Sequence, residues 1–143
     1  MLGTPLIATK GWAAREVEQT YLDAQELCQT IGETSDLFMV LWGLWTCKQV
    51  QGKIYTAREF AEKCFNLVQR QDDPVRHVGA HLALGQVLFF SGEFSASRTH
   101  IEQVEQAIGF YDTQQHPDYT LRYKVLCTYY TANLDFVKVS GGK

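Results

Sequence analysis

Apolar residues recur along most of this chain with the period of an α-helix. From Val17 they return at every third or fourth position as far as Ile31, and the same rhythm runs through residues 57–68 and 97–108. This spacing gathers them on one helical face and disfavours strands, in which apolar positions alternate. The pattern therefore predicts an all-α chain. The expected helices are residues 2–9, 13–31, 35–50, 54–71, 74–91, 94–112 and 119–138.

The segment from Pro74 to Ser91 is too continuously apolar to assign by period alone. Its length and the absence of an internal breaker favour a helix. Asp73 and Pro74 form a good helix start, because the first turn leaves an N–H unpaired and proline has none. Gly92 is a good stop, because glycine takes the left-handed conformation that closes helices. Two further boundary signals are Thr34-Ser35-Asp36, expected to cap the third helix, and His116-Pro117-Asp118, expected to break the chain before the seventh.

The chain also repeats itself. The segment LWTCKQVQG (residues 44–52) aligns with LGQVLFFSG (residues 84–92) at a shift of 40 residues, and a weaker copy follows Gly11. A period of this length is typical of one helix pair per repeat. The sequence therefore predicts tandem antiparallel helix hairpins in a single helical-repeat domain, residues 1–143. Its expected parts are a half repeat at 1–31, repeats at 35–71 and 74–112, and a half repeat at 118–139.

Three longer segments carry a family resemblance. They are LGTPLIATKGWAAREVEQTYLDAQELCQTIGETSDLFMVLWGLW, ALGQVLFFSGEFSASRTHIEQ and FYDTQQHPDYTLRY. Together they resemble the tetratricopeptide-like repeat region of large bacterial signalling ATPases, which join a cyclase or protein kinase domain to an AAA-type ATPase and a C-terminal helical superhelix. The resemblance covers residues 1 to about 123. It implies a right-handed tetratricopeptide-like α-solenoid of about seven helices, without the cyclase, kinase or nucleotide-binding parts.

The match to that family has local exceptions. Leu84-Gly85 fits the Leu-Gly pair that the family places in the middle of a helix, where the missing side chain permits close helix approach. In the other copy Leu44 is followed by Trp45, which breaks the pattern. Beyond Tyr123 the similarity is lost, and the tail is interpreted as the first helix of another repeat.

Composition and charge exclude several function classes. The chain is 45% hydrophobic, which suits a folded globular protein, and its formal net charge is −3 with no basic block, so we expect no nucleic-acid partner. Its longest apolar run, residues 37–45, is too short to cross a membrane. The start lacks the features of a secretory signal. We therefore expect a cytoplasmic protein without membrane contact.

The four cysteines agree with that compartment. They are Cys28, Cys47, Cys64 and Cys127. They are irregularly spaced, contain no C-x-x-C motif, and each lies within an apolar pattern. Buried reduced thiols are the prediction, because free cysteine packs as a small hydrophobe. Two disulfides in a secreted domain are the alternative.

Catalytic and cofactor motifs are absent from the sequence, so we expect no enzyme and no cofactor. The acidic residues recur at helical spacings that indicate solvated faces; they include Glu16, Glu18, Glu59, Glu62, Glu102 and Glu105. His77 and His81 have the spacing of a helical metal-binding pair, for which Cys47 or His100 would be the nearest third ligand. Nothing in the sequence supplies that ligand, so packed or exposed histidines are expected and no metal site is assigned.

A binding surface is the remaining expectation. In a superhelix the first helix of each pair lines the concave side, and this geometry predicts a mixed apolar and amide groove for a peptide or a helix. The groove residues are Met39, Trp42, Thr46 and Gln49 from one copy and Leu82, Gln86 and Phe89 from the next. Ordinary packing or a dimer seam is the alternative interpretation. The sequence thus favours a protein–protein interaction scaffold, with an effector-sensing helical domain as the alternative, and half repeats at both ends favour a homodimer.

Overall fold

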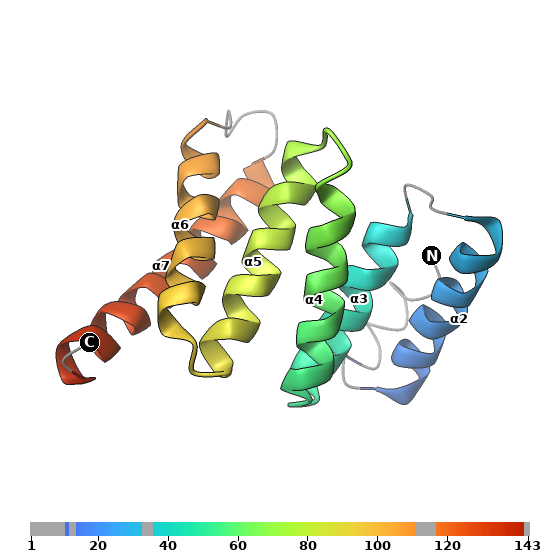
Figure 1. Cartoon of the computed structure of the whole chain (residues 1–143), viewed down its shortest axis with the longest axis horizontal. Coiled ribbons are helices and arrows are strands. Elements are labelled where there is room, and N and C mark those ends of the chain that lie inside the picture. Colours follow the sequence, from blue (N-terminus) through green and yellow to red (C-terminus); the bar gives the residue numbers. More distant parts are fainter. Residues whose placement is uncertain (1–10, 12–13, 33–35, 111–116, 142–143) are drawn as a thin grey trace. The chain divides into compact units, whose positions relative to one another are not determined.

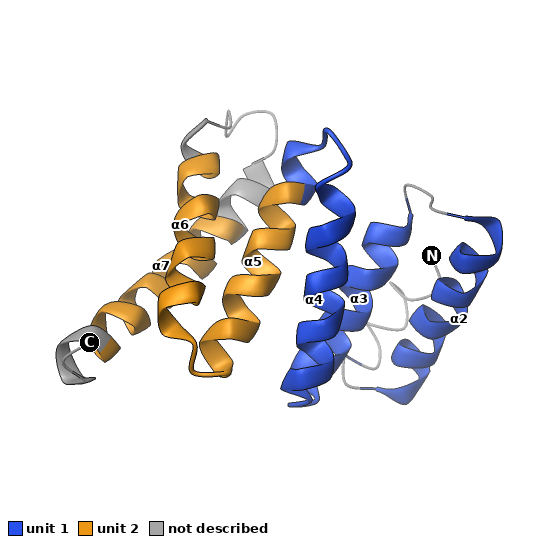
Figure 2. Ribbon diagram, viewed as in Figure 1, with its two compact units in different colours: residues 1–76 blue, residues 77–143 orange. Residues whose placement is uncertain are grey.

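A computed structural model describes residue 11 and residues 14–32, 36–110 and 117–141, and all regular secondary structure in these residues is helical (Figure 1). The helices are α2 (Arg15–Ile31), α3 (Leu37–Val50), α4 (Ile54–Val68), α5 (Pro74–Phe90), α6 (Phe94–Phe110) and α7 (Pro117–Gly141). The predicted all-α fold is confirmed for this part of the chain. The helix expected at residues 2–9 lies outside the described residues. The chain forms two compact units, residues 1–76 (unit 1) and 77–143 (unit 2) (Figure 2).

Two helix starts test the predicted capping signals. At α5 the prediction is confirmed, because the carboxylate of Asp73 accepts a hydrogen bond from the backbone N–H of Arg76 at 3.2 Å. Asp36 occupies the position before α3 but makes no capping hydrogen bond through its side chain, so the predicted cap is wrong for this residue. Thr34 and Ser35 lie outside the described residues.

Two helices, α4 and α7, differ from their predicted bounds by three residues at one end, whereas the other described helix ends lie within two residues of their predicted positions. α4 ends at Val68 instead of residue 71, because Arg70 and Gln71 donate to carbonyls three residues back, at 3.3 Å and 3.1 Å. Bonds of this kind tighten the chain and close a helix. α7 begins at Pro117, two residues before its predicted start, because proline at the first helical position loses no hydrogen bond.

The repeat seen in the sequence is also present in the backbone. The turn between α3 and α4 and the turn between α5 and α6 use the same hydrogen bonds, 40 residues apart. The matching pairs, each given as N–H donor and carbonyl acceptor, are Gln51 to Cys47 and Ser91 to Val87, Gly52 to Gln49 and Gly92 to Phe89, and Lys53 to Lys48 and Glu93 to Leu88. Gly52 and Gly92 have φ of 76° and 81°, the region that glycine adopts without steric cost. The predicted stop at Gly92 is confirmed, and Gly52 is its counterpart.

Burial follows the same spacing. In the second helix of each hairpin, one face is almost fully buried. Its residues are Ala57, Ala61, Cys64 and Val68 in α4 and, 40 residues later, Ser97, Ile101, Val104 and Ile108 in α6. The two hairpins therefore bury equivalent positions. These are the positions that the helical spacing of apolar residues predicts in the sequence.

In unit 1, α3 packs against both α2 and α4. Gly43 of α3 lies so close to the ring of Tyr21 of α2 that a Cβ atom at residue 43 would overlap it. Trp45, which interrupts the Leu-Gly pattern, is only 4% exposed. The close approach in this helix is thus made by a glycine two residues before the position that the repeat alignment compares.

In unit 2, α5, α6 and α7 share one core. Its buried members are Val78, Leu82, Ile101, Val104, Ile108, Cys127, Tyr130 and Leu134. The pair Leu84-Gly85 behaves as the resemblance implies, because a Cβ at Gly85 would lie 2.6 Å from Ile101 Cδ1 of α6. The buried hydroxyl of Ser97 donates to the Gly85 carbonyl at 2.7 Å. Residues 124–141 are helical, and α7 packs on α6, so the described part of the tail belongs to this core.

Candidate functional site

The α3 part of the predicted groove consists of Met39, Trp42, Thr46 and Gln49, which share one face of the helix. Met39 is 48% exposed, and the other three residues are half-buried. The Trp42 ring stacks on Phe38 with 6.0 Å between centroids. The Thr46 hydroxyl donates to the Trp42 carbonyl at 2.9 Å. This face therefore offers a partner a thioether and a partly exposed indole, whereas the amide oxygen of Gln49 is buried.

The α5 part of the predicted groove is more deeply buried. Leu82 is 1% exposed and belongs to the core of unit 2, so packing accounts for it. Gln86 is 6% exposed. Phe89 is half-buried, and its ring meets Tyr130 of α7 edge-on at 5.3 Å between centroids. The α3 and α5 sets belong to different units, and a groove that joins them stays a prediction.

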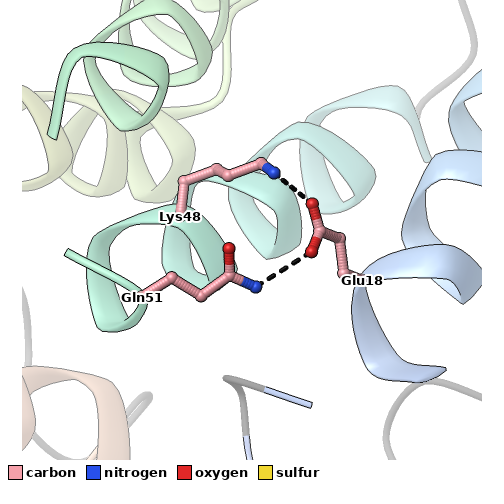
Figure 3. Close-up of polar contacts among 3 residues, drawn as sticks. All are labelled: Glu18, Lys48 and Gln51. Atoms are coloured by element: carbon pink, nitrogen blue, oxygen red, sulfur yellow. Dashed lines mark hydrogen bonds and ion pairs between the residues drawn. The ribbon is translucent and has the colours of Figure 1, made fainter. Parts of the chain in front are cut away.

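A polar cluster joins α2 to α3 within unit 1 (Figure 3). The carboxylate of Glu18 pairs with the ammonium group of Lys48 and accepts a hydrogen bond from Gln51 Nε2 at 2.9 Å. The side chains of Glu18 and Lys48 are only 15% and 13% exposed. The prediction that Glu18 lies on a solvated face is therefore wrong. Its partners follow it by 30 and 33 residues, a separation that no local spacing rule connects.

The contacts in this cluster keep Glu18 ionised and the neighbouring Cys47 protonated. Hydrogen bonds from Lys48 and Gln51 lower the pKa of Glu18, so the carboxylate stays ionised. Burial, assisted by the Glu18 charge, raises the pKa of the neighbouring Cys47 thiol to about 11. At neutral pH an ionised carboxylate of lowered pKa is a weak general base and a protonated thiol is a poor nucleophile, so these contacts chiefly hold α2 against α3.

Two further cysteines, Cys64 and Cys127, are also poor nucleophiles. All four cysteines are free thiols, as predicted, and Cys47, Cys64 and Cys127 are buried while Cys28 is half-buried. Burial raises the pKa of Cys64 and of Cys127 to about 12. Because the thiolate is the reactive form, these two groups are inert near neutral pH.

A histidine pair links α5 to α6 in unit 2. The Nδ1 atoms of His81 and His100 lie 2.9 Å apart, so the Nδ1–H of one ring donates a hydrogen bond to the Nδ1 of the other. Burial, followed by the charges of His100 and His77, lowers the pKa of His81 to about 4. Burial also lowers the pKa of His100. Both rings are therefore neutral at pH 7. Among the described residues, no three His, Cys, Asp or Glu side chains are placed to hold a metal ion.

Acidification from about pH 7 to about pH 5 will lower the stability of the protein through this pair. The folded-state pKa values lie below the ordinary 6.5, so the unfolded chain gains protons first, and stability is lost as the pH falls from about 6.5 towards about 4. Urea midpoints measured at the two pH values test this. In the double variant His81→Gln/His100→Gln the difference between them should largely vanish, and an undiminished difference contradicts the assignment.

No protein-family model, curated protein or solved structure matches this chain. Within the part of the chain that the structure describes, no helix is both long and apolar enough to cross a membrane.

Proposed function

We propose that this chain is a non-catalytic protein–protein interaction scaffold, built as a right-handed tetratricopeptide-like α-solenoid and similar to the repeat region of bacterial signalling ATPases. It acts in the cytoplasm on a protein or peptide partner, without nucleic acid, membrane or cofactor. The repeated hairpin is the observation that carries the proposal: α3–α4 and α5–α6 share turn geometry and buried positions. Tandem hairpins of one design stack into extended binding surfaces.

The character of the side chains supports binding over chemistry. The groups whose pKa is shifted are engaged in packing or pairing, as in the Glu18–Lys48 ion pair and the His81–His100 contact. Apolar side chains that a partner can cover are instead well exposed; Met39 is 48% exposed. Met and aromatic residues are the types that protein interfaces favour.

Selection of ligands from a display library of random peptides, panned on the immobilised chain, tests this function. Selected peptides should bind the purified chain in fluorescence anisotropy, and Met39→Glu should weaken them at least about tenfold, because a charge would enter an apolar contact. Tyr55→Glu is the matched control, because Tyr55 is 88% exposed on α4, outside the groove. A library without enriched peptides, or peptides indifferent to Met39→Glu, contradicts the proposal.

One observation favours the alternative of an effector-sensing domain. The indole N–H of Trp45 is buried without a hydrogen-bond partner, beside the Trp42 ring at 4.7 Å between centroids. Leaving such a donor unpaired costs about 1–3 kcal/mol, which a small ligand with an acceptor atom would recover. A thermal-shift screen against metabolites should then give a hit that Trp45→Phe abolishes. A flat response leaves the scaffold as the function.

A further inference from the structure

Helix α7 carries two apolar faces. The first, which packs into the core of unit 2, contains Cys127, Tyr130 and Leu134. The second, called the exposed stripe below, contains Val125, Tyr129, Ala132 and Phe136. At about 100° per residue the two sets lie on opposite sides of the helix. Val125, Tyr129 and Phe136 are 62%, 56% and 70% exposed. A surface helix with one buried face normally turns polar residues outward, so this stripe is unusual for a free surface.

Helix α3, the first helix of the α3–α4 hairpin, shows how two faces of one helix are covered. α3 is packed on two sides, by α2 and by α4. α7 is packed by α6 through its buried face. The exposed stripe therefore suits a further helix.

We propose that the exposed stripe is the seam of a homodimer, in which α7 packs antiparallel against α7 of a second copy. Its spacing of four, three and four residues is that of a coiled-coil seam and reads the same in both directions. A two-fold axis between Tyr129 and Ala132 sets Val125 against Phe136 of the second copy, and Tyr129 against Ala132. Each contact then joins a larger side chain to a smaller one, which favours interdigitation.

The flanking charges select the antiparallel direction. Lys124 and Asp135 are both exposed and lie on the same side of α7, next to the stripe. Asp135 also pairs with Arg98 of α6 at 2.9 Å, which holds its carboxylate in place. In a parallel dimer the two-fold axis runs along the helices, so this side of the second copy lies on the far edge of the seam and Lys124 and Asp135 cannot pair between copies. In the antiparallel register Lys124 falls within two residues of Asp135 of the second copy, about 3 Å along the axis.

This inference deepens the proposed interaction function, on which it rests for the view that the chain binds proteins. The two fail separately, because the peptide selection probes α3 and the dimer depends on α7.

Light scattering behind size exclusion, from about 1 to about 300 µM, tests the dimer. The mass of the wild type should rise from 16.3 kDa towards twice that value. Phe136→Glu should raise the dissociation constant at least about tenfold, because a charge would enter the seam. Tyr55→Glu places the same charge at a fully solvated aromatic and should leave the constant unchanged. A wild type that stays monomeric, or a dimer that tolerates Phe136→Glu, overturns the proposal.

Disulfide cross-linking tests the register. In a Cys28→Ser background, Val125→Cys mixed with Phe136→Cys should form a mixed dimer rapidly, whereas Val125→Cys alone should not, because its two copies lie about 16 Å apart. Rapid self-linking of Val125→Cys would mean parallel helices and overturn the register. A monomeric chain that binds a synthetic peptide of the α4 sequence, Ile54–Val68, would assign the stripe to a hairpin-type partner instead.

Discussion

Replacement of Lys48 by methionine will destabilise unit 1 by about 3 kcal/mol. The substitution removes the cation from Glu18, whose side chain is 15% exposed, and leaves the carboxylate with the hydrogen bond from Gln51. Breaking a largely buried ion pair costs about 3–5 kcal/mol, and the remaining exposure of Glu18 places this site at the low end of that range. Urea unfolding followed by tryptophan fluorescence measures the loss.

The double variant Glu18→Leu/Lys48→Met is the control that separates the stranded charge from lost packing. Both charges are then replaced by apolar groups of similar size, and such a replacement is often close to neutral. We expect the double variant to recover most of the stability that Lys48→Met loses. Equal losses in the single and double variants would show that the alkyl chain of Lys48, and not its charge, stabilises the α2–α3 contact.

Acid should diminish the effect of Lys48→Met. The pKa of Glu18 is lowered in the folded protein. Its contribution to folding stability is therefore fully present above about pH 4.5 and is lost as the pH falls through the folded-state pKa. In Lys48→Met the main cause of that lowering is absent. The difference in unfolding free energy between wild type and variant should therefore shrink below about pH 4, while the histidine pair affects both proteins alike.

The sequence was sufficient for features that local rules determine. The helical spacing of apolar residues predicts that Ala57 and Ser97 lie on buried faces. The 40-residue repeat aligns Gly52 with Gly92 and so predicts the two glycine turns. Periodicity and left-handed turns depend on residues within a few positions of one another, so a single sequence contains the whole signal.

Contacts between helices were not predictable in the same way. Glu18 meets Lys48 across 30 residues, and His81 meets His100 across 19. Such pairs depend on how two helices cross, and helical spacing does not fix the crossing angle. Leu82 illustrates the same limit at the candidate site: its position on a first helix suggested a groove, and the crossing of α5, α6 and α7 buried it. The exposed stripe on α7 was not predictable from spacing, because apolar residues on both faces of a helix hide the pattern of a single face.

Replacement of Ile101 by alanine will destabilise unit 2 by about 3–4 kcal/mol. Ile101 is 1% exposed in the shared core, so truncation removes three buried carbons and leaves a cavity. The neighbouring His100 should become more hydrated, which would weaken the pH dependence described above. Ile31→Ala is the same substitution at a residue that is 68% exposed on α2, and it should cost less than about 0.5 kcal/mol. Similar losses at both positions would contradict the assignment of Ile101 to the core.

Gly85→Ala makes this prediction sharper, because a methyl group at residue 85 would lie 2.6 Å from Ile101 Cδ1. Alone, Gly85→Ala gains about 1 kcal/mol of helix propensity but pushes the fully packed Ile101 side chain out of its place, so it should destabilise. In the Ile101→Ala background the new methyl group occupies the vacated space, and the same substitution should stabilise. The double-mutant cycle should therefore show a favourable coupling of at least about 1 kcal/mol. Additive losses would mean that a side chain at residue 85 does not meet Ile101, and the explanation given above for the glycine of the Leu-Gly pair would fail.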